Sequence, residues 1–199
     1  MIKSDRWIRQ MSLEHGMIDP FRDDPERTPN IISSGLTNSG YDVRLSNKYL
    51  KFVNNHPEIV IDPKNLDPKL FIEHEGDFVV IPPNSFALGH SMEKFKKPKG
   101  IKGFCEGKST YARCAVSIPM TPLEPGWEGV LTIEIGNHAP NPLKVYSFEG
   151  IAQISFFEVE ECDSDYSSRS NKYQGQTGIT LPRSSLKSAR LARIALETR

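Results

Sequence analysis

The sequence predicts a mainly β domain whose short strands form a barrel, a roll or a sandwich. Between residues 41 and 159, short apolar runs alternate with turns that contain Pro or Gly. The same region shows no sustained repeat of apolar residues at helical spacing. With 199 residues, 37% of them hydrophobic, the chain is long enough for one domain with a single core.

The first predicted element is a short helix over residues 5–15. Ser4 can cap its N-terminus and Gly16 can end it. Apolar residues, among them Trp7 and Met11, share one face of this helix.

The chain after this helix alternates between loop and strand signals. Residues 21–39 are rich in Pro, Asn, Ser and Gly, which predicts a loop. The predicted strands then cover residues 41–45, 59–61, 78–81, 86–89, 116–120, 130–135, 143–148 and 151–159.

Two polar segments follow the last predicted strand. Residues 161–182 are rich in Ser and Gly and predict a mobile arm, and residues 183–199 form a basic tail of unknown role. The tail carries five basic side chains and one acidic, a net charge of +4. The rest of the chain carries 20 basic and 24 acidic side chains, a net charge of −4. Any anion site in the body of the protein therefore has to be built from a few local groups.

Composition excludes several classes of protein. The chain has 25 basic and 25 acidic residues, which argues against a dedicated nucleic-acid binder. No apolar run approaches the ~20 residues of a membrane span, and the first residues lack the apolar segment of a secretory signal. The three cysteines lie 9 and 48 positions apart, which is no disulfide framework and favours a cytoplasmic protein. The histidines are scattered and no two cysteines are three positions apart, so we expect no zinc site.

The strand predicted at 130–135 carries a candidate catalytic carboxylate. Strand alternation places Leu131 and Ile133 on one face, and Thr132 and Glu134 on the other. Glu134 can simply face solvent on a half-buried strand. A catalytic role requires that its polar face lines a pocket.

Four motifs in order give this carboxylate a context. They are Gly-Lys-Ser-Thr-Tyr-Ala-Arg at 107–113, Pro-Gly-Trp-Glu-Gly-Val-Leu-Thr-Ile-Glu at 125–134, Lys-Tyr-Gln-Gly-Gln-Thr-Gly at 172–178, and Gly-Tyr-Asp-Val-Arg-Leu at 40–45. This set resembles the dCTP deaminases, relatives of the trimeric dUTPases. The match runs from the first helix to about Pro182. The segment between the first two motifs is shorter than in the enterobacterial-type members, and the tail extends beyond the family pattern.

The resemblance implies a fold, a reaction and partners. It implies one domain over residues 1–182 with a distorted β-barrel or jelly-roll-like fold of the dUTPase type, assembled as a homotrimer with shared active sites. The implied reaction is hydrolysis of dCTP to dUTP and ammonia, which feeds dUMP and dTTP synthesis. The implied Mg²⁺ is carried by the substrate triphosphate, and inhibition by dTTP is a family trait that the sequence leaves open.

Hydrolytic deamination of cytosine must deliver water to C4, protonate N3 and expel ammonia, so without a metal cofactor a carboxylate has to move the protons. By resemblance Glu134 is this general base and acid. Ser109 is expected to hold the attacking water or the exocyclic amine, and Arg113 to fix the carboxylate and keep it ionised.

The remaining candidates concern the sugar, the base and the phosphates. Glu124 is expected to bind the sugar 3′-hydroxyl, whereas Trp127 either packs on the deoxyribose or is plain core. Strand alternation is expected to turn Lys108 and Thr110 away from Ser109, towards the phosphates. The predicted arm is expected to fold over the ligand. The full set of substrate-binding candidates is Lys108, Thr110, Thr121, Pro122, Glu124, Trp127, Gln153, Tyr166, Lys172 and Gln176.

Three alternatives remain open. One is a bifunctional enzyme that releases dUMP, ammonia and pyrophosphate from dCTP. A second is a dUTPase proper, which uses an Asp in a G-x-I-D-x-x-Y-type turn, whereas the comparable turn at 122–127 contains neither Asp nor Tyr. A binding-only member of the fold is the non-enzymatic alternative.

Overall fold

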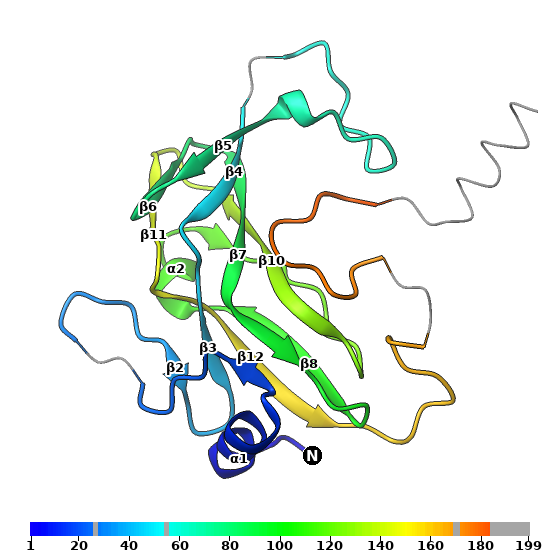
Figure 1. Ribbon diagram of the computed structural model, residues 1–199. Coiled ribbons are helices and arrows are strands. Elements are labelled where there is room, and N and C mark those ends of the chain that lie inside the picture. Colours follow the sequence, from blue (N-terminus) through cyan, green and yellow to red (C-terminus); the bar gives the residue numbers. More distant parts are fainter. Residues whose placement is uncertain (26–27, 54–55, 169–171, 184–199) are drawn as a thin grey trace, which may run out of the picture.

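The computed structural model describes residues 1–25, 28–53, 56–168 and 172–183 and is mainly β (Figure 1). Residues 184–199 of the predicted tail and residues 169–171 of the predicted arm lie outside the described part. The elements are α1 (Asp5–His15), β1 (Ile18–Asp19), β2 (Gly35–Leu36), β3 (Tyr41–Arg44), β4 (Lys48–Phe52), a 3-10 turn (Pro68–Leu70), β5 (Phe71–Glu75), β6 (Phe78–Ile81), β7 (Ser85–Lys96), β8 (Ile101–Gly107), α2 (Ser109–Ala112), β9 (Val116–Ser117), β10 (Glu128–Asn137), β11 (Leu143–Tyr146) and β12 (Gly150–Glu158).

The strands form three antiparallel sheets. The largest has the order β5-β4-β7-β10-β9, with β1 added on β7. The second has the order β2-β3-β12-β8, and the third is the pair β11-β6. The expectation of a barrel is wrong for the described residues, because the end strands β5 and β9 of the largest sheet do not pair with each other and the sheet stays open.

The core lies between the sheets. One face of β10 packs against it, and for this reason the alternation predicted for this strand holds. The residues of β10 alternate between half-buried and buried along the whole strand. Ile133 and Ile135 are fully buried in the core, together with Tyr41 from β3 and Phe156 from β12. Half-buried Thr132 and Glu134 face the other side, so the predicted division of this strand is confirmed.

The predicted N-terminal helix is confirmed over the same residues. Ile8 is fully buried, and the Trp7 ring lies 6.5 Å from that of Phe156. Gly16 ends the helix with φ +63°, a left-handed conformation that glycine adopts without strain. Ser4 occupies the N-cap position, but its side chain makes no capping hydrogen bond.

Several strands differ from the prediction. The strand predicted at 86–89 is part of the twelve-residue β7, whereas residues 59–61 form no strand, and Val60 is 81% exposed. Strands β1, β2, β4, β5 and β8 were not predicted, and β2 lies in the segment that was predicted as a loop. Strand β5 contains Glu73, His74 and Glu75 and therefore has no apolar alternation, and it is stabilised by pairing with β4.

Within the described residues, no helix has both the length and the apolar character that a membrane crossing requires.

Candidate functional site

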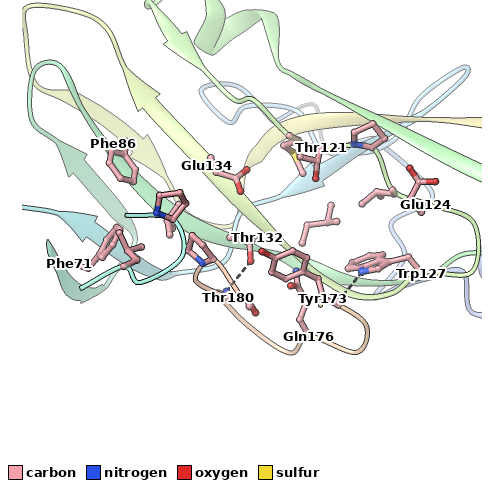
Figure 2. Close-up of a pocket in the computed structure, with 18 of the residues that line it drawn as sticks. Phe71, Phe86, Thr121, Glu124, Trp127, Thr132, Glu134, Tyr173, Gln176 and Thr180 are labelled. Carbon is pink, nitrogen blue, oxygen red and sulfur yellow. Dashed lines mark hydrogen bonds between the residues drawn. The ribbon is translucent and has the colours of Figure 1, made fainter. Parts of the chain in front are cut away.

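A pocket of about 420 Å³ lies on the polar face of β10. One side is formed by the segment that precedes β10, which we call the rim (residues 120–127). The opposite side is formed by aromatic and aliphatic side chains of β4, β5, β7 and the loop before β5, and the C-terminal segment 173–182 lies across the remaining side (Figure 2). The lining residues are Phe52, Ile61, Pro63, Leu66, Phe71, Phe86, Leu88, Met120, Thr121, Pro122, Leu123, Glu124, Trp127, Leu131, Thr132, Glu134, Tyr166, Tyr173, Gln176, Thr180 and Pro182.

Strand β10 places the carboxylate of Glu134 in this pocket. It lies between the aromatic side, with Phe71 and Phe86, and the rim, with Thr121 (Figure 2). Burial raises its pKa, and the opposing effect comes only from its own backbone N–H. Among the described residues no side chain donates a hydrogen bond to this carboxylate. A carboxyl group with a raised pKa takes up a proton more readily than an ordinary carboxylate, which favours general acid–base catalysis.

The rim brings three of the predicted substrate-binding residues to the pocket: Thr121, Pro122 and Glu124. The Glu124 carboxylate also forms an ion pair with Lys102, at 3.2 Å. Trp127, at the end of the rim, is 5% exposed and belongs to the core cluster, yet it also lines the pocket. Trp127 is therefore a core residue, one of the two expected alternatives, and its place in the pocket lining leaves packing on the deoxyribose as a prediction.

The C-terminal segment, orange in Figure 1, is held beside β10 by backbone contacts. Val130 N–H donates to the carbonyl of Gln176 at 2.9 Å, and the Gln176 side-chain amide donates to the carbonyl of Val130 at 2.6 Å. Further along, Thr180 N–H donates to the Thr132 hydroxyl at 3.0 Å. Gly129 permits this approach, because a Cβ there would lie 3.0 Å from the Gln176 carbonyl oxygen. Gln176 thus reaches the pocket from the same chain.

Two predicted binding residues meet at a second place, which we call the Asp42 cluster (Ser33, Asp42, Lys108 and Gln153). The Lys108 ammonium forms a hydrogen-bonded ion pair with the Asp42 carboxylate and donates to the Ser33 hydroxyl at 3.1 Å. Gln153 donates to the other Asp42 oxygen at 2.9 Å. None of these four residues lines the pocket around Glu134.

Four further candidates lie on the surface, whereas Tyr166 lines the Glu134 pocket. Ser109, Thr110 and Arg113 are exposed and do not line the Glu134 pocket, and the Arg113 guanidinium donates to the Ser109 carbonyl at 3.1 Å. Lys172 is exposed as well. Lys108 and Thr110 do not follow the predicted strand alternation, because Ser109–Ala112 forms the short helix α2.

Some pocket residues were missed by the sequence analysis. The Phe52 and Phe86 rings stack 4.7 Å apart, and Phe71 meets Phe86 edge-on at 5.8 Å. These rings come from β4, β5 and β7, so only the pairing of the strands brings them together. The motif that contains Asp42 was noted, but its role as the partner of Lys108 and Gln153 was not.

Comparisons with known proteins agree with the resemblance. The family model described as dCTP deaminase-like matches residues 2–159. The chain is 52% identical over 183 residues to a dCTP deaminase of Chloroflexus aggregans, covering 92% of this chain and 97% of that one. It is 50% identical over 186 residues to a dCTP deaminase of Dechloromonas aromatica, covering 92% and 98%.

Among solved structures, the fold is similar to the crystal structure of 2′-deoxycytidine 5′-triphosphate deaminase from Agrobacterium tumefaciens. The TM-score is 0.58 at 17% identity, and the match covers 78% of this chain and 47% of that one. At this identity the likeness concerns the fold alone. On the strength of the family model and of the relatives that are about half identical, the chain belongs to the dCTP deaminase-like family.

Proposed function

We propose that this protein is an enzyme that hydrolyses dCTP to dUTP and ammonia, and that Glu134 moves the protons. The observation that carries this proposal is the position of Glu134, a carboxyl group of raised pKa in a pocket on the strand that completes the second motif. The names of the relatives that are about half identical over 92% of the chain supply the substrate.

The chemistry asks one group to take a proton and return it. In its ionised form Glu134 accepts a proton from the attacking water as oxygen adds to C4 of the base, and it passes this proton to N3. A second transfer, from the new hydroxyl to the amine, lets ammonia leave as the C4 carbonyl forms. Each proton starts on water and ends on the product or on ammonia, so the carboxyl group is regenerated. These steps need no metal cofactor, and Mg²⁺ enters with the triphosphate as part of the substrate.

The pocket has the surroundings that such a carboxyl group needs. Apolar side chains, among them Phe71, Phe86 and Leu88, line it on one side, and they disfavour the ionised form. The rim offers polar groups of Thr121 and Glu124 for the base and the sugar. The C-terminal segment, with Gln176, lines the pocket, and we expect it to limit access of solvent to the reacting atoms.

We further propose a homotrimer with shared sites, in which Ser109 and Arg113 act at the Glu134 pocket of a neighbouring subunit. The support is their exposure on α2, away from the pocket of their own subunit. Lys108 and Gln153 are then expected to serve the phosphates at the Asp42 cluster, with Thr110 and Lys172 contributing from the surface. Binding of a triphosphate would have to displace Asp42 from Lys108, because the two are paired in this structure.

One assay tests the proposed reaction. The enzyme is incubated with dCTP and Mg²⁺, and ammonia and pyrophosphate are both measured. Ammonia without pyrophosphate is the expected result. Release of both products would instead assign the bifunctional reaction, and pyrophosphate from dUTP with no product from dCTP would assign a dUTPase.

A further inference from the structure

Lys97 is a buried lysine that the proposed reaction does not use. It directly follows β7 and is 4% exposed. Its ammonium group donates to three backbone carbonyls, those of Leu123, of Ile101 at 3.3 Å and of Glu124 at 2.7 Å. A lysine ammonium has three N–H donors, so each of them has an acceptor.

Two of these three carbonyls belong to the rim of the pocket. Leu123 and Glu124 both line the cavity that contains Glu134. Ile101, the third partner, is the first residue of β8 and is buried. The ammonium of Lys97 therefore links the rim to the start of β8.

Backbone hydrogen bonds around Lys97 connect the same segments. Leu123 and Gly103 exchange two hydrogen bonds, of 2.8 and 3.0 Å, which join the rim to β8. Lys97 N–H donates to the Trp127 carbonyl at 3.1 Å. Lys97 thus contacts the rim at two places, through its side chain at Leu123 and Glu124 in the middle and through its backbone at Trp127 at the end.

A buried ammonium is an unfavourable way to fill space, because it loses its hydration. Burial lowers the pKa of Lys97 to about 7, against the attraction of the Glu124 carboxylate. The other titratable groups that act on it are Lys102 and the Cys105 thiol, whose own pKa burial raises to about 12. An apolar side chain of similar length would fill the space without this desolvation cost. What the lysine adds, compared with such a side chain, is the three hydrogen bonds.

We propose that Lys97 is a positioning residue for nucleotide binding, and that its ammonium holds the carbonyls of Leu123 and Glu124 so that the rim keeps the shape that receives the base and sugar. This inference rests on the proposed function in one respect, that dCTP is the nucleotide which enters the pocket. Lys97 itself does not line the pocket and touches no reacting atom.

The test compares Lys97→Met with Lys96→Met, which removes the neighbouring, exposed lysine. For each variant, kcat and KM for dCTP are measured, together with hydrogen–deuterium exchange of the peptide that covers residues 120–127 in the absence of nucleotide. In Lys97→Met we expect KM to rise about tenfold while kcat stays within about threefold, because a displaced rim weakens ground state and transition state alike. Exchange across the rim should be faster than in Lys96→Met, while exchange across β12 should be unchanged.

If KM and rim exchange in Lys97→Met equal those of Lys96→Met, the positioning role is overturned. If Lys97→Met does not fold, Lys97→Leu replaces it under the same criteria, since Leu also removes all three N–H donors. The two proposals fail separately: a wild-type enzyme that does not deaminate dCTP defeats the proposed function, whereas the exchange comparison, which uses no nucleotide, still decides the role of Lys97.

Discussion

The Trp127 indole N–H donates to the carbonyl of Tyr173 at 3.0 Å, so the rim of the pocket and the C-terminal segment are joined by a hydrogen bond. Both residues line the cavity around Glu134 (Figure 2). Trp127 therefore contributes this hydrogen bond in addition to its buried side chain. It holds one end of the segment that crosses the pocket.

Replacing Trp127 by Phe should loosen the C-terminal segment, because it keeps an aromatic ring but removes the indole donor. We expect a loss of about 1 kcal/mol in the free energy of unfolding and faster hydrogen exchange across residues 172–178. Trp7→Phe is the matched control, since Trp7 packs on Phe156, in another part of the structure. Equal exchange at 172–178 in the two variants would show that the hydrogen bond does not hold the segment.

Glu134→Gln should remove turnover of dCTP by a factor of about 10²–10⁴, because the amide cannot accept and return the protons. Binding of dCTP, measured by calorimetry, should change by less than about threefold, since the side chain keeps its shape. Glu128→Gln, on the same strand, is the control, because the Glu128 carboxylate pairs with Lys94 rather than lining the pocket. Normal turnover by Glu134→Gln would show that another group moves the protons.

The raised pKa of Glu134 has a consequence for stability. A carboxyl group whose pKa is higher in the folded than in the unfolded state favours folding when protonated, and this contribution is lost as the pH rises through the folded-state pKa. Gln does not titrate, so the stability of the wild type relative to Glu134→Gln should fall between acidic and neutral pH. The measurement is the denaturant midpoint of both proteins at pH 4 and pH 8. A difference between the two proteins that does not change with pH would contradict the assigned pKa shift.

The proposed sharing of sites between subunits can be tested by mixing two variants. Arg113→Ala and Glu134→Gln should each be inactive alone. If the two residues act from different subunits, trimers reassembled from equal amounts should recover about a quarter of the wild-type activity, because about a quarter of the sites combine an intact Arg113 with an intact Glu134. Mass spectrometry verifies that mixed oligomers form. Mixed trimers without activity would place both residues in one subunit.

Local patterns were sufficient for several parts of the protein. The helix at 5–15 follows from its apolar face and its terminal Gly16, and the division of β10 follows from strand alternation. Both depend on neighbours in the sequence, so a single sequence contains the information. The order of the four motifs led to the family for the same reason, as each motif is a short contiguous segment.

Other features depend on contacts between distant segments and could not be predicted. Strand β5 is stabilised by its pairing with β4. The largest sheet is open because its end strands, β5 and β9, do not pair with each other. The strand alternation predicted for Lys108 was wrong, because the next residues, Ser109–Ala112, form a helix directly after the end of a strand. The apolar pattern of a short segment does not tell which distant segments it will pair with.

By itself, the sequence determined that the protein is mainly β, that Glu134 shares a strand face with Thr132, and that its motifs are those of the dCTP deaminase-like family. The tertiary structure alone decided that this face lines a pocket, that burial raises the pKa of its carboxyl group, and that Lys97 reaches the rim. The physical reason is that desolvation and hydrogen bonding of a side chain depend on which distant segments surround it. Strand periodicity specifies the direction of a side chain, but only packing specifies what it meets.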